Sequence, residues 1–118
     1  MKILVADDHD IFRRGLRALL EDHPGWEICG EASNGMEALD KALKLKPDVA
    51  VLDVTMPELN GLEVTRKVLA ALPECNVIIL SQHEASLLEE PALQAGAKVY
   101  LTKSDAGLKL VEAIKQLL

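Results

Sequence analysis

Short apolar runs alternate along the chain with longer stretches in which apolar residues recur every three or four positions. The runs predict five strands, at residues 3–6, 26–32, 48–53, 77–80 and 99–102. The periodic stretches predict a helix after each strand, and the last helix covers residues 106–118. Strands that are apolar throughout are typical of a parallel sheet buried on both faces. The alternation therefore predicts an α/β fold of three layers, with a doubly wound five-stranded parallel sheet between helices.

Local signals fix the ends of several elements. Asn34 and Asn60 are each followed three positions later by a glutamate, which is the capping-box pattern of a helix N-terminus. We expect the helix after Asn34 to turn three apolar residues toward the core, namely Met36, Leu39 and Leu43. The strand at 26–32 alternates apolar and polar residues, which predicts an edge strand with one wetter face.

The fourth helix carries a proline in the segment that leads to its end at Ala95-Gly96. Proline lacks a backbone N–H, and its ring clashes with the preceding helical turn. We therefore expect this helix to begin late, near Glu90-Pro91, or to be kinked.

Composition narrows the function classes. The 118 residues correspond to one domain, and a net charge of −6 disfavours direct binding of nucleic acid by this chain. The opening apolar run is too short for a secretory signal or a membrane span. Cys29 and Cys75 suit a reducing environment, and we expect both to act as small buried hydrophobes. We therefore expect a cytoplasmic protein that makes no contact with a membrane.

Polar residues follow four of the predicted strands. Asp7-Asp8 come after the first strand, Asp53 ends the third, Ser81 follows the fourth, and Lys103 follows the fifth. The carboxyl ends of parallel strands meet at one edge of a sheet, and ligands bind in the crevice there. We therefore expect these side chains to converge.

Carboxylates that share a crevice repel one another unless a divalent cation neutralises them. Oxygen ligands select Mg²⁺ or Ca²⁺, and Mg²⁺ commonly combines a few carboxylates with water and a phosphate oxygen. Lys103 adds a charge suited to phosphate, and Ser81 adds a hydroxyl donor. These groups suit phosphoryl transfer, with Asp53 as the nucleophile that forms an acyl phosphate.

Each residue also has an ordinary interpretation. An aspartate such as Asp8 commonly caps a turn, a lone Lys103 would face solvent, and Ser81 could cap the next helix. Asp53 is harder to explain in this way, because it directly follows four apolar residues. His9 either rims the site or caps a helix. The coincidence of all these features at one edge favours the functional interpretation.

At these residues the chain resembles the receiver domain of two-component response regulators, over essentially its whole length. The matching segments are Ile3–His9, Val51–Pro57, Asn60–Gly61, Ile79–Ser81, Ala95–Ala97 and Tyr100–Lys103. The resemblance implies a flavodoxin-like sheet with strand order 2-1-3-4-5. It implies one receiver domain over residues 1–118, either standing alone or as a fragment of a longer regulator.

The resemblance also assigns the site. It makes Asp53 the phosphoacceptor and Lys103 the lysine that pairs first with the acceptor and then with the phosphoryl group. It makes Asp8 a direct Mg²⁺ ligand, Asp7 a ligand through water, and the backbone carbonyl of Thr55 a further ligand.

The resemblance implies a switch and an output as well. The Ser81 hydroxyl would move to hold a phosphoryl oxygen, and the Tyr100 ring would then turn inward. The phosphodonor would be a phosphohistidine on a sensor histidine kinase, and the signal would leave through the face made by the fourth helix, fifth strand and fifth helix. The opening Asp-Asp-His and the closing Lys-Ser-Asp are most similar to LuxR-type transcriptional regulators. We therefore expect a DNA-binding output domain outside this chain and homodimerisation on phosphorylation.

Some positions depart from the common family pattern. Ser104 follows Lys103 where many members have proline, so we expect no cis peptide bond there. Val99 stands where glycine is common. Thr55 and His83 occupy the positions that flank the acyl phosphate and tune its lifetime.

Three other functions can be weighed. A phosphatase of the haloacid dehalogenase type needs a second acid two residues after its nucleophile, where this chain has Thr55. A flavin or nucleotide module needs a glycine-rich or hydroxyl-rich loop after the first strand, where residues 7–10 are mostly acidic. A degenerate receiver that acts only by protein–protein interaction ranks low, because the site residues are present. We expect a switch and not an enzyme.

Overall fold

The structure is a computed structural model that describes residues 1–82 and 87–117. Strands and helices alternate along the chain, as the apolar pattern predicts. The strands are β1 (Lys2–Ala6), β2 (Glu27–Ala32), β3 (Val49–Asp53), β4 (Asn76–Ser81) and β5 (Val99–Thr102). The helices are α1 (Asp10–Glu21), α2 (Gly35–Leu45), α3 (Gly61–Ala71), α4 (Glu89–Ala95) and α5 (Lys103–Gln116).

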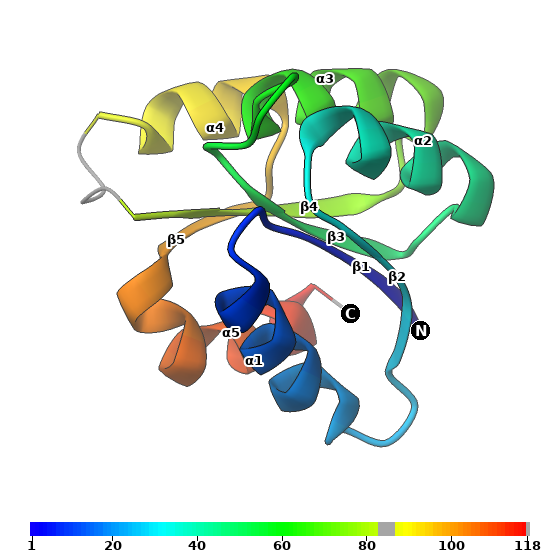
Figure 1. The fold of residues 1–118 in the computed structure, drawn as a ribbon, viewed down its shortest axis with the longest axis vertical. Helices are drawn as coiled ribbons and strands as arrows, with labels where there is room; N and C mark the ends of the chain where they lie inside the picture. The colour runs from blue at the N-terminus through cyan, green and yellow to red at the C-terminus, as the bar shows by residue number, and fades with distance from the viewer. Residues whose placement is uncertain (83–86, 118) are drawn as a thin grey trace.

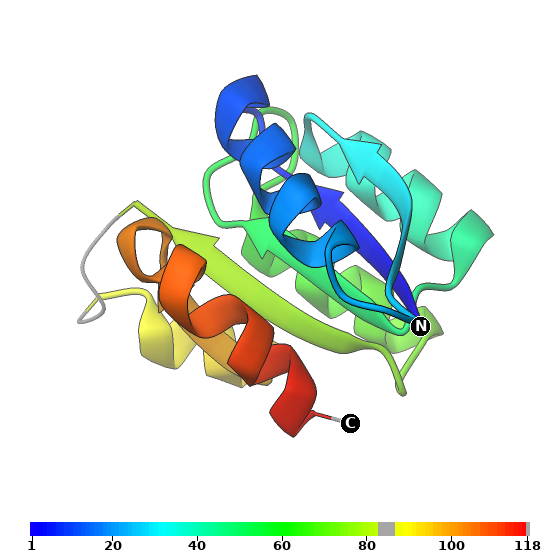
Figure 2. The same ribbon diagram turned by 90° about the horizontal axis from the view of Figure 1, so that it is seen from below.

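The five strands form one parallel sheet in the order β2-β1-β3-β4-β5, which confirms the predicted topology. Figure 1 shows α1 and α5 on one face of the sheet and α2, α3 and α4 on the other, and Figure 2 shows the first face in front. Each face has its own apolar core, so the middle of the sheet is buried on both sides. Every residue of β3 is buried.

The helix caps and the edge strand follow the sequence signals. The side chains of Asn34 and Asn60 accept hydrogen bonds from the N–H groups of Glu37 and Glu63, at 2.8 and 3.0 Å. Strand β2 lies at the sheet edge, and most of its residues are half-buried. The two caps and the edge position of β2 are confirmed, whereas burial along β2 does not alternate between a drier and a wetter face.

The buried side of α2 differs from the prediction. Met36 and Leu43 are exposed, at 53% and 42%, and Leu39 is only partly buried against the core. The residues that face the sheet are Ala38 and Ala42, both fully buried. Small side chains let this helix approach the sheet closely, so a pattern read from large apolar residues alone assigns the wrong face.

The start of α5 differs from the prediction, whereas the start of α4 agrees with it. Helix α5 begins at Lys103, three residues before the predicted start, because the Thr102 side chain accepts the Asp105 N–H and caps the helix. Helix α4 begins at Glu89 with Pro91 in its first turn, where a missing N–H is tolerated, so the late start is confirmed. The peptide bonds of the described residues are trans, Lys103–Ser104 included.

The two cysteines and Trp26 pack in or against the apolar cores. Cys75 is buried as expected, whereas Cys29 is only partly buried. Trp26 packs against the core on the α1 and α5 side and stacks on His23, with ring centroids 4.6 Å apart. His83 and Leu118 lie outside the described residues.

Candidate functional site

The carboxyl ends of the strands bring the predicted side chains together at one edge of the sheet. Asp7 and Asp53 are 1% and 2% exposed, and Ser81 is 1% exposed. In the β3–β4 register, Asp53 pairs with Leu80, so Ser81 follows directly beside it. Buried carboxylates are costly unless they are paired, so this edge needs a cation.

Lys103 provides that charge. Its Nζ lies 2.8 Å from Asp7 Oδ2 and 3.2 Å from Asp53 Oδ2, and its side chain is only 9% exposed. Asp7 after β1, Asp53 at the end of β3 and Lys103 at the start of α5 thus meet in one ion cluster, although they lie far apart in sequence. The early start of α5 is what places Lys103 on the first turn of a helix and not on a loose loop.

The Asp53 carboxylate occupies an unusual environment. Burial and, to a smaller extent, the nearby Asp7 carboxylate raise the pKa of Asp53, while Lys103 and the Thr55 N–H lower it, and the net result is a pKa of about 6. The Thr55 N–H donates to Asp53 Oδ1 at 3.3 Å. At neutral pH the carboxyl group is therefore mostly ionised, which is the form that acts as a nucleophile.

The other predicted residues surround this cluster. The Asp8 side chain is 32% exposed at the rim, and His9 Nδ1 lies 3.2 Å from Asp7 Oδ1 and 3.1 Å from Lys103 Nζ. His9 therefore lies at the rim, and it is also the N-cap residue of α1, although its side chain makes no capping hydrogen bond. Tyr100 is 7% exposed and lies in the core beneath α3 and α4.

Two further residues, which no sequence pattern pointed to, lie beside the site. Arg13 donates from Nη1 to the carbonyl of Asp7 at 2.6 Å and also pairs with Asp10 and Glu31. The Phe12 ring lies 4.8 Å from Lys103 Nζ, within the range of a cation–π contact. Both residues are on α1, and their helical spacing alone gave no sign that they face the site.

The acidic residues fit a divalent cation. Asp7, Asp8 and Asp53, with His9, each offer a ligand atom within 4.8 Å of the others. Within the described residues, Asp7 Oδ2 is buried and accepts no hydrogen bond, although it lies close to Lys103. This buried oxygen has the Lys103 ammonium as its close partner, and the three carboxylates together form the hard donor set that Mg²⁺ prefers.

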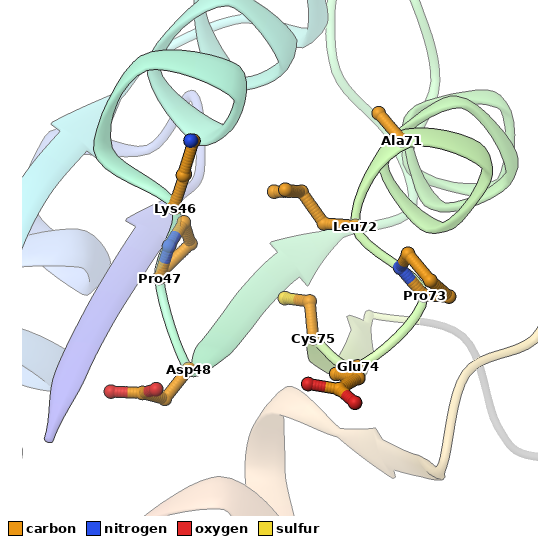
Figure 3. A pocket seen from close by; sticks show the side chains of 8 residues that line it. All are labelled: Lys46, Pro47, Asp48, Ala71, Leu72, Pro73, Glu74 and Cys75. Carbon is orange, nitrogen blue, oxygen red and sulfur yellow. The ribbon is translucent and has the colours of Figure 1, made fainter.

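A separate hollow lies at the opposite edge of the sheet. It has a volume of about 420 Å³ and is framed by the α2–β3 and α3–β4 connections. Figure 3 shows the side chains of Leu72 and Cys75 directed into it, with Lys46, Asp48 and Glu74 around it. Burial raises the pKa of the Cys75 thiol to about 11, so this sulfur is a poor nucleophile at neutral pH. The hollow lies apart from the acidic cluster.

One known protein family matches almost the whole chain. Residues 3–115 match the family described as the response regulator receiver domain. The chain belongs to this family. In the described part of this receiver, each helix is too short or too polar to cross a bilayer.

The receiver has close relatives among curated proteins. It is 43% identical to the response regulator GacA of Pseudomonas syringae over 98% of this chain and 54% of that protein. It is 37% identical to the DNA-binding transcriptional activator DevR/DosR of Mycobacterium tuberculosis, over 98% of this chain and 53% of that protein. The chain therefore spans about half the length of these relatives.

A solved structure agrees with the fold. The signal receiver domain of the putative response regulator NarL from Mycobacterium tuberculosis is 32% identical, with a TM-score of 0.91 over 98% of this chain and 93% of that one. A further similar structure is a two-component response regulator of the LuxR family from Aurantimonas sp.. The predicted similarity to receivers of LuxR-type regulators is therefore confirmed.

Proposed function

We propose that this receiver is a phosphorylation-dependent switch in which Asp53 accepts a phosphoryl group from a phosphohistidine on a sensor histidine kinase. The observation that carries the proposal is the buried pair of Asp53 and Lys103, whose charged atoms lie 3.2 Å apart at the carboxyl edge of the sheet. Buried ion pairs are weak contributors to stability, so a pair kept here suits a chemical role.

The bonds that form and break in the transfer step belong to Asp53, the phosphoryl group and the donor histidine. One carboxylate oxygen of Asp53 forms a bond to phosphorus while the P–N bond to the donor imidazole breaks. The imidazole nitrogen keeps the electron pair and takes up a proton. Lys103 lies beside the attacking carboxylate and donates to the phosphoryl oxygens as their charge develops, which is the electrostatic assistance that phosphoryl transfer needs.

We propose Mg²⁺ as the metal of this site. Asp8 and Asp53 would hold it through carboxylate oxygens, and Asp7 would do so through a water molecule. The backbone carbonyl of Thr55 would be a further ligand. When bound, Mg²⁺ supplies positive charge to the phosphoryl oxygens. The chain's own contribution is to keep the carboxylates close together and largely out of water. Lys103 offsets the repulsion between the Asp7 and Asp53 carboxylates by pairing with both of them.

The output belongs to the same proposal. Ser81 ends the strand beside Asp53, and Tyr100 lies on the next strand, in register with Ile79. A movement of the Ser81 hydroxyl toward a phosphoryl oxygen would be passed to Tyr100 and then to the face of α4, β5 and α5. Since the curated relatives are longer and include a DNA-binding activator, we propose that this face controls a DNA-binding domain through homodimerisation.

We propose that the domain does not turn over a substrate. A phosphatase that uses an aspartyl nucleophile needs a general acid two residues later, and Thr55 has no carboxyl group to protonate a leaving group. Incubation with small phosphoesters should therefore release no phosphate beyond the slow loss of the acyl phosphate itself.

The test of the proposal is labelling by acetyl phosphate in the presence and absence of Mg²⁺. The wild-type chain should take up one phosphoryl group only with Mg²⁺, and Asp53→Asn should take up none. Asp40→Asn removes an exposed carboxylate on α2 and is the matched control, so it should be labelled like wild type. Labelling of Asp53→Asn at the wild-type rate would overturn the proposal.

A further inference from the structure

The start of α2 touches the loop that follows Asp53, backbone against backbone. A Cβ added to Gly35 would lie 1.7 Å from the carbonyl oxygen and 2.5 Å from the carbonyl carbon of Leu59. Gly35 also donates its N–H to the Pro57 carbonyl at 3.2 Å. Its φ is not positive, so steric space and not backbone torsion is what requires glycine here. Figure 1 shows this loop beside the start of α2.

The loop in question, residues 54–60, is called the site loop below. It begins directly after Asp53 and contains Thr55, whose N–H already holds Asp53 Oδ1. The other end of the site loop is fixed in the same way, because a Cβ on Gly61 would lie 2.3 Å from the Asp53 carbonyl oxygen. Gly61 also donates its N–H to Val54 at 2.9 Å. The site loop is thus held between two glycine backbones.

The contact at Gly35 leaves little freedom to adjust. The two nearest atoms that a new methyl group would meet are backbone atoms of Leu59, and the third is its Cβ, so none of them can rotate away as the end of a side chain can. Any larger residue at position 35 must push the site loop away from α2 by more than an ångström. A displacement of that size at a metal or reaction site commonly costs a large factor in affinity or rate.

We infer that Gly35, the first residue of α2, is a positioning residue for the phosphoryl site, which sets the placement of Thr55 and the site loop through backbone contact. This inference rests on the proposed function, since it concerns the Mg²⁺ and phosphoryl site of Asp53. It gives α2 a direct mechanical connection to the site, on the opposite side of Asp53 from Ser81 and Tyr100.

The chain supplies a matched control. Gly15 in α1 and Gly107 in α5 are helical glycines like Gly35, but a Cβ added to either of them would meet nothing within 4 Å. Gly15→Ala and Gly107→Ala therefore change the same atoms in open space. Any effect of alanine on helix formation appears in all three variants, whereas an effect on the site loop appears in Gly35→Ala alone.

The experiment measures the Kd for Mg²⁺ by calorimetric titration of folded protein, well below the unfolding temperature. We expect Gly35→Ala to raise this Kd about tenfold. Gly15→Ala and Gly107→Ala should keep the wild-type Kd. Labelling by acetyl phosphate at a saturating Mg²⁺ concentration should recover part of the loss. Circular dichroism without Mg²⁺ should show that Gly35→Ala is as fully folded as wild type at the temperature of the titration, which separates weaker binding from a general loss of stability. A folded Gly35→Ala variant with the wild-type Kd would overturn the inference.

A second variant keeps the test decisive if Gly35→Ala alone does not fold. Leu59→Gly removes the side chain nearest to the added methyl group and frees the backbone there to turn its carbonyl aside. The comparison is then between Gly35→Ala/Leu59→Gly and Leu59→Gly alone. The double variant should bind Mg²⁺ more weakly, and equal Kd values would overturn the inference.

The two proposals fail in different ways. If the wild-type chain neither binds Mg²⁺ nor takes label on Asp53, the proposed function is wrong. If the wild-type chain does both and Gly35→Ala matches it, the proposed function stands and only the role of Gly35 is wrong.

Discussion

The two edges of the sheet use charged residues in opposite ways. At the amino edge, charges serve the chain's own backbone at the surface: the Lys2 N–H donates to Asp48 Oδ2 and Lys2 Nζ donates to the Leu45 carbonyl, both at 2.8 Å. At the carboxyl edge, Asp7, Asp53 and Lys103 are buried and face one another. The first arrangement closes the fold, whereas the second accepts repulsion and desolvation that the fold does not need. Buried charge that the fold does not require is the reason to propose a functional site at the carboxyl edge.

The largest expected difference between the edges concerns their lysines. Lys103→Met removes the cation between two buried carboxylates and should lower the free energy of unfolding by about 3 kcal/mol without Mg²⁺. Lys46→Met, beside the hollow at the amino edge, should change it by less than about 0.5 kcal/mol. Urea unfolding at pH 7.5 measures both. Equal effects would mean that the carboxyl edge is not held together by Lys103.

The next effect separates charge from shape at Asp53. Its raised pKa means that the protonated form stabilises the fold below the unfolded value near 4, and that this stability is lost as pH rises toward about 6. Asp53→Asn cannot ionise, so at pH 7.5 without Mg²⁺ it should be about 1–2 kcal/mol more stable than wild type. The advantage should shrink as pH falls from 6 to 4.

Asp40→Asn on α2 is the control for this pH dependence, because it removes an exposed carboxylate of the same size. Its free energy of unfolding at pH 7.5 should stay within about 0.5 kcal/mol of wild type. An Asp53→Asn variant less stable than wild type at pH 7.5 would show that the Asp53 carboxylate supports the fold.

Mg²⁺ should act on one edge only. At ten times its Kd it should stabilise the wild-type chain by about 1.4 kcal/mol, seen as a rise in Tm that a chelator reverses. Asp7→Asn should lose most of this rise, whereas Asp48→Asn at the amino edge should keep it. A rise that survives Asp7→Asn would place the ion elsewhere on the protein.

The smallest effect tests the hollow at the amino edge. Cys75→Ala removes a buried sulfur and should lower the free energy of unfolding by about 1 kcal/mol or less. Labelling by acetyl phosphate should not change, because the thiol lies apart from the acidic cluster. A loss of labelling in this variant would mean that the two edges are coupled.

The sequence allowed the architecture and the convergence of polar side chains at one edge to be predicted, because apolar runs, capping asparagines and strand ends are local signals. Asp7, Asp53, Ser81 and Lys103 follow strands, and parallel topology alone brings such residues together. The side of a helix that faces the sheet is not a local property, and α2 shows this: its sheet side is formed by Ala38 and Ala42.

The neighbours of the site were not predictable for a related reason. Phe12 carries no polar signal, and the role of Arg13 depends on the angle at which α1 crosses the sheet. The contact of Gly35 with Leu59 depends on how the start of α2 meets the site loop. The residues around Gly35 and Leu59 carry no local signal of that contact.

The most direct test of the account is chemical identification of the residue that carries the phosphoryl group. Labelled wild-type protein is treated with borohydride, which reduces an acyl phosphate of aspartate to homoserine, and the position is read by peptide mass spectrometry. The account predicts homoserine at position 53 alone, formed only when Mg²⁺ was present during labelling. Homoserine at Asp7 or Asp8, or a label that borohydride leaves in place, would contradict it.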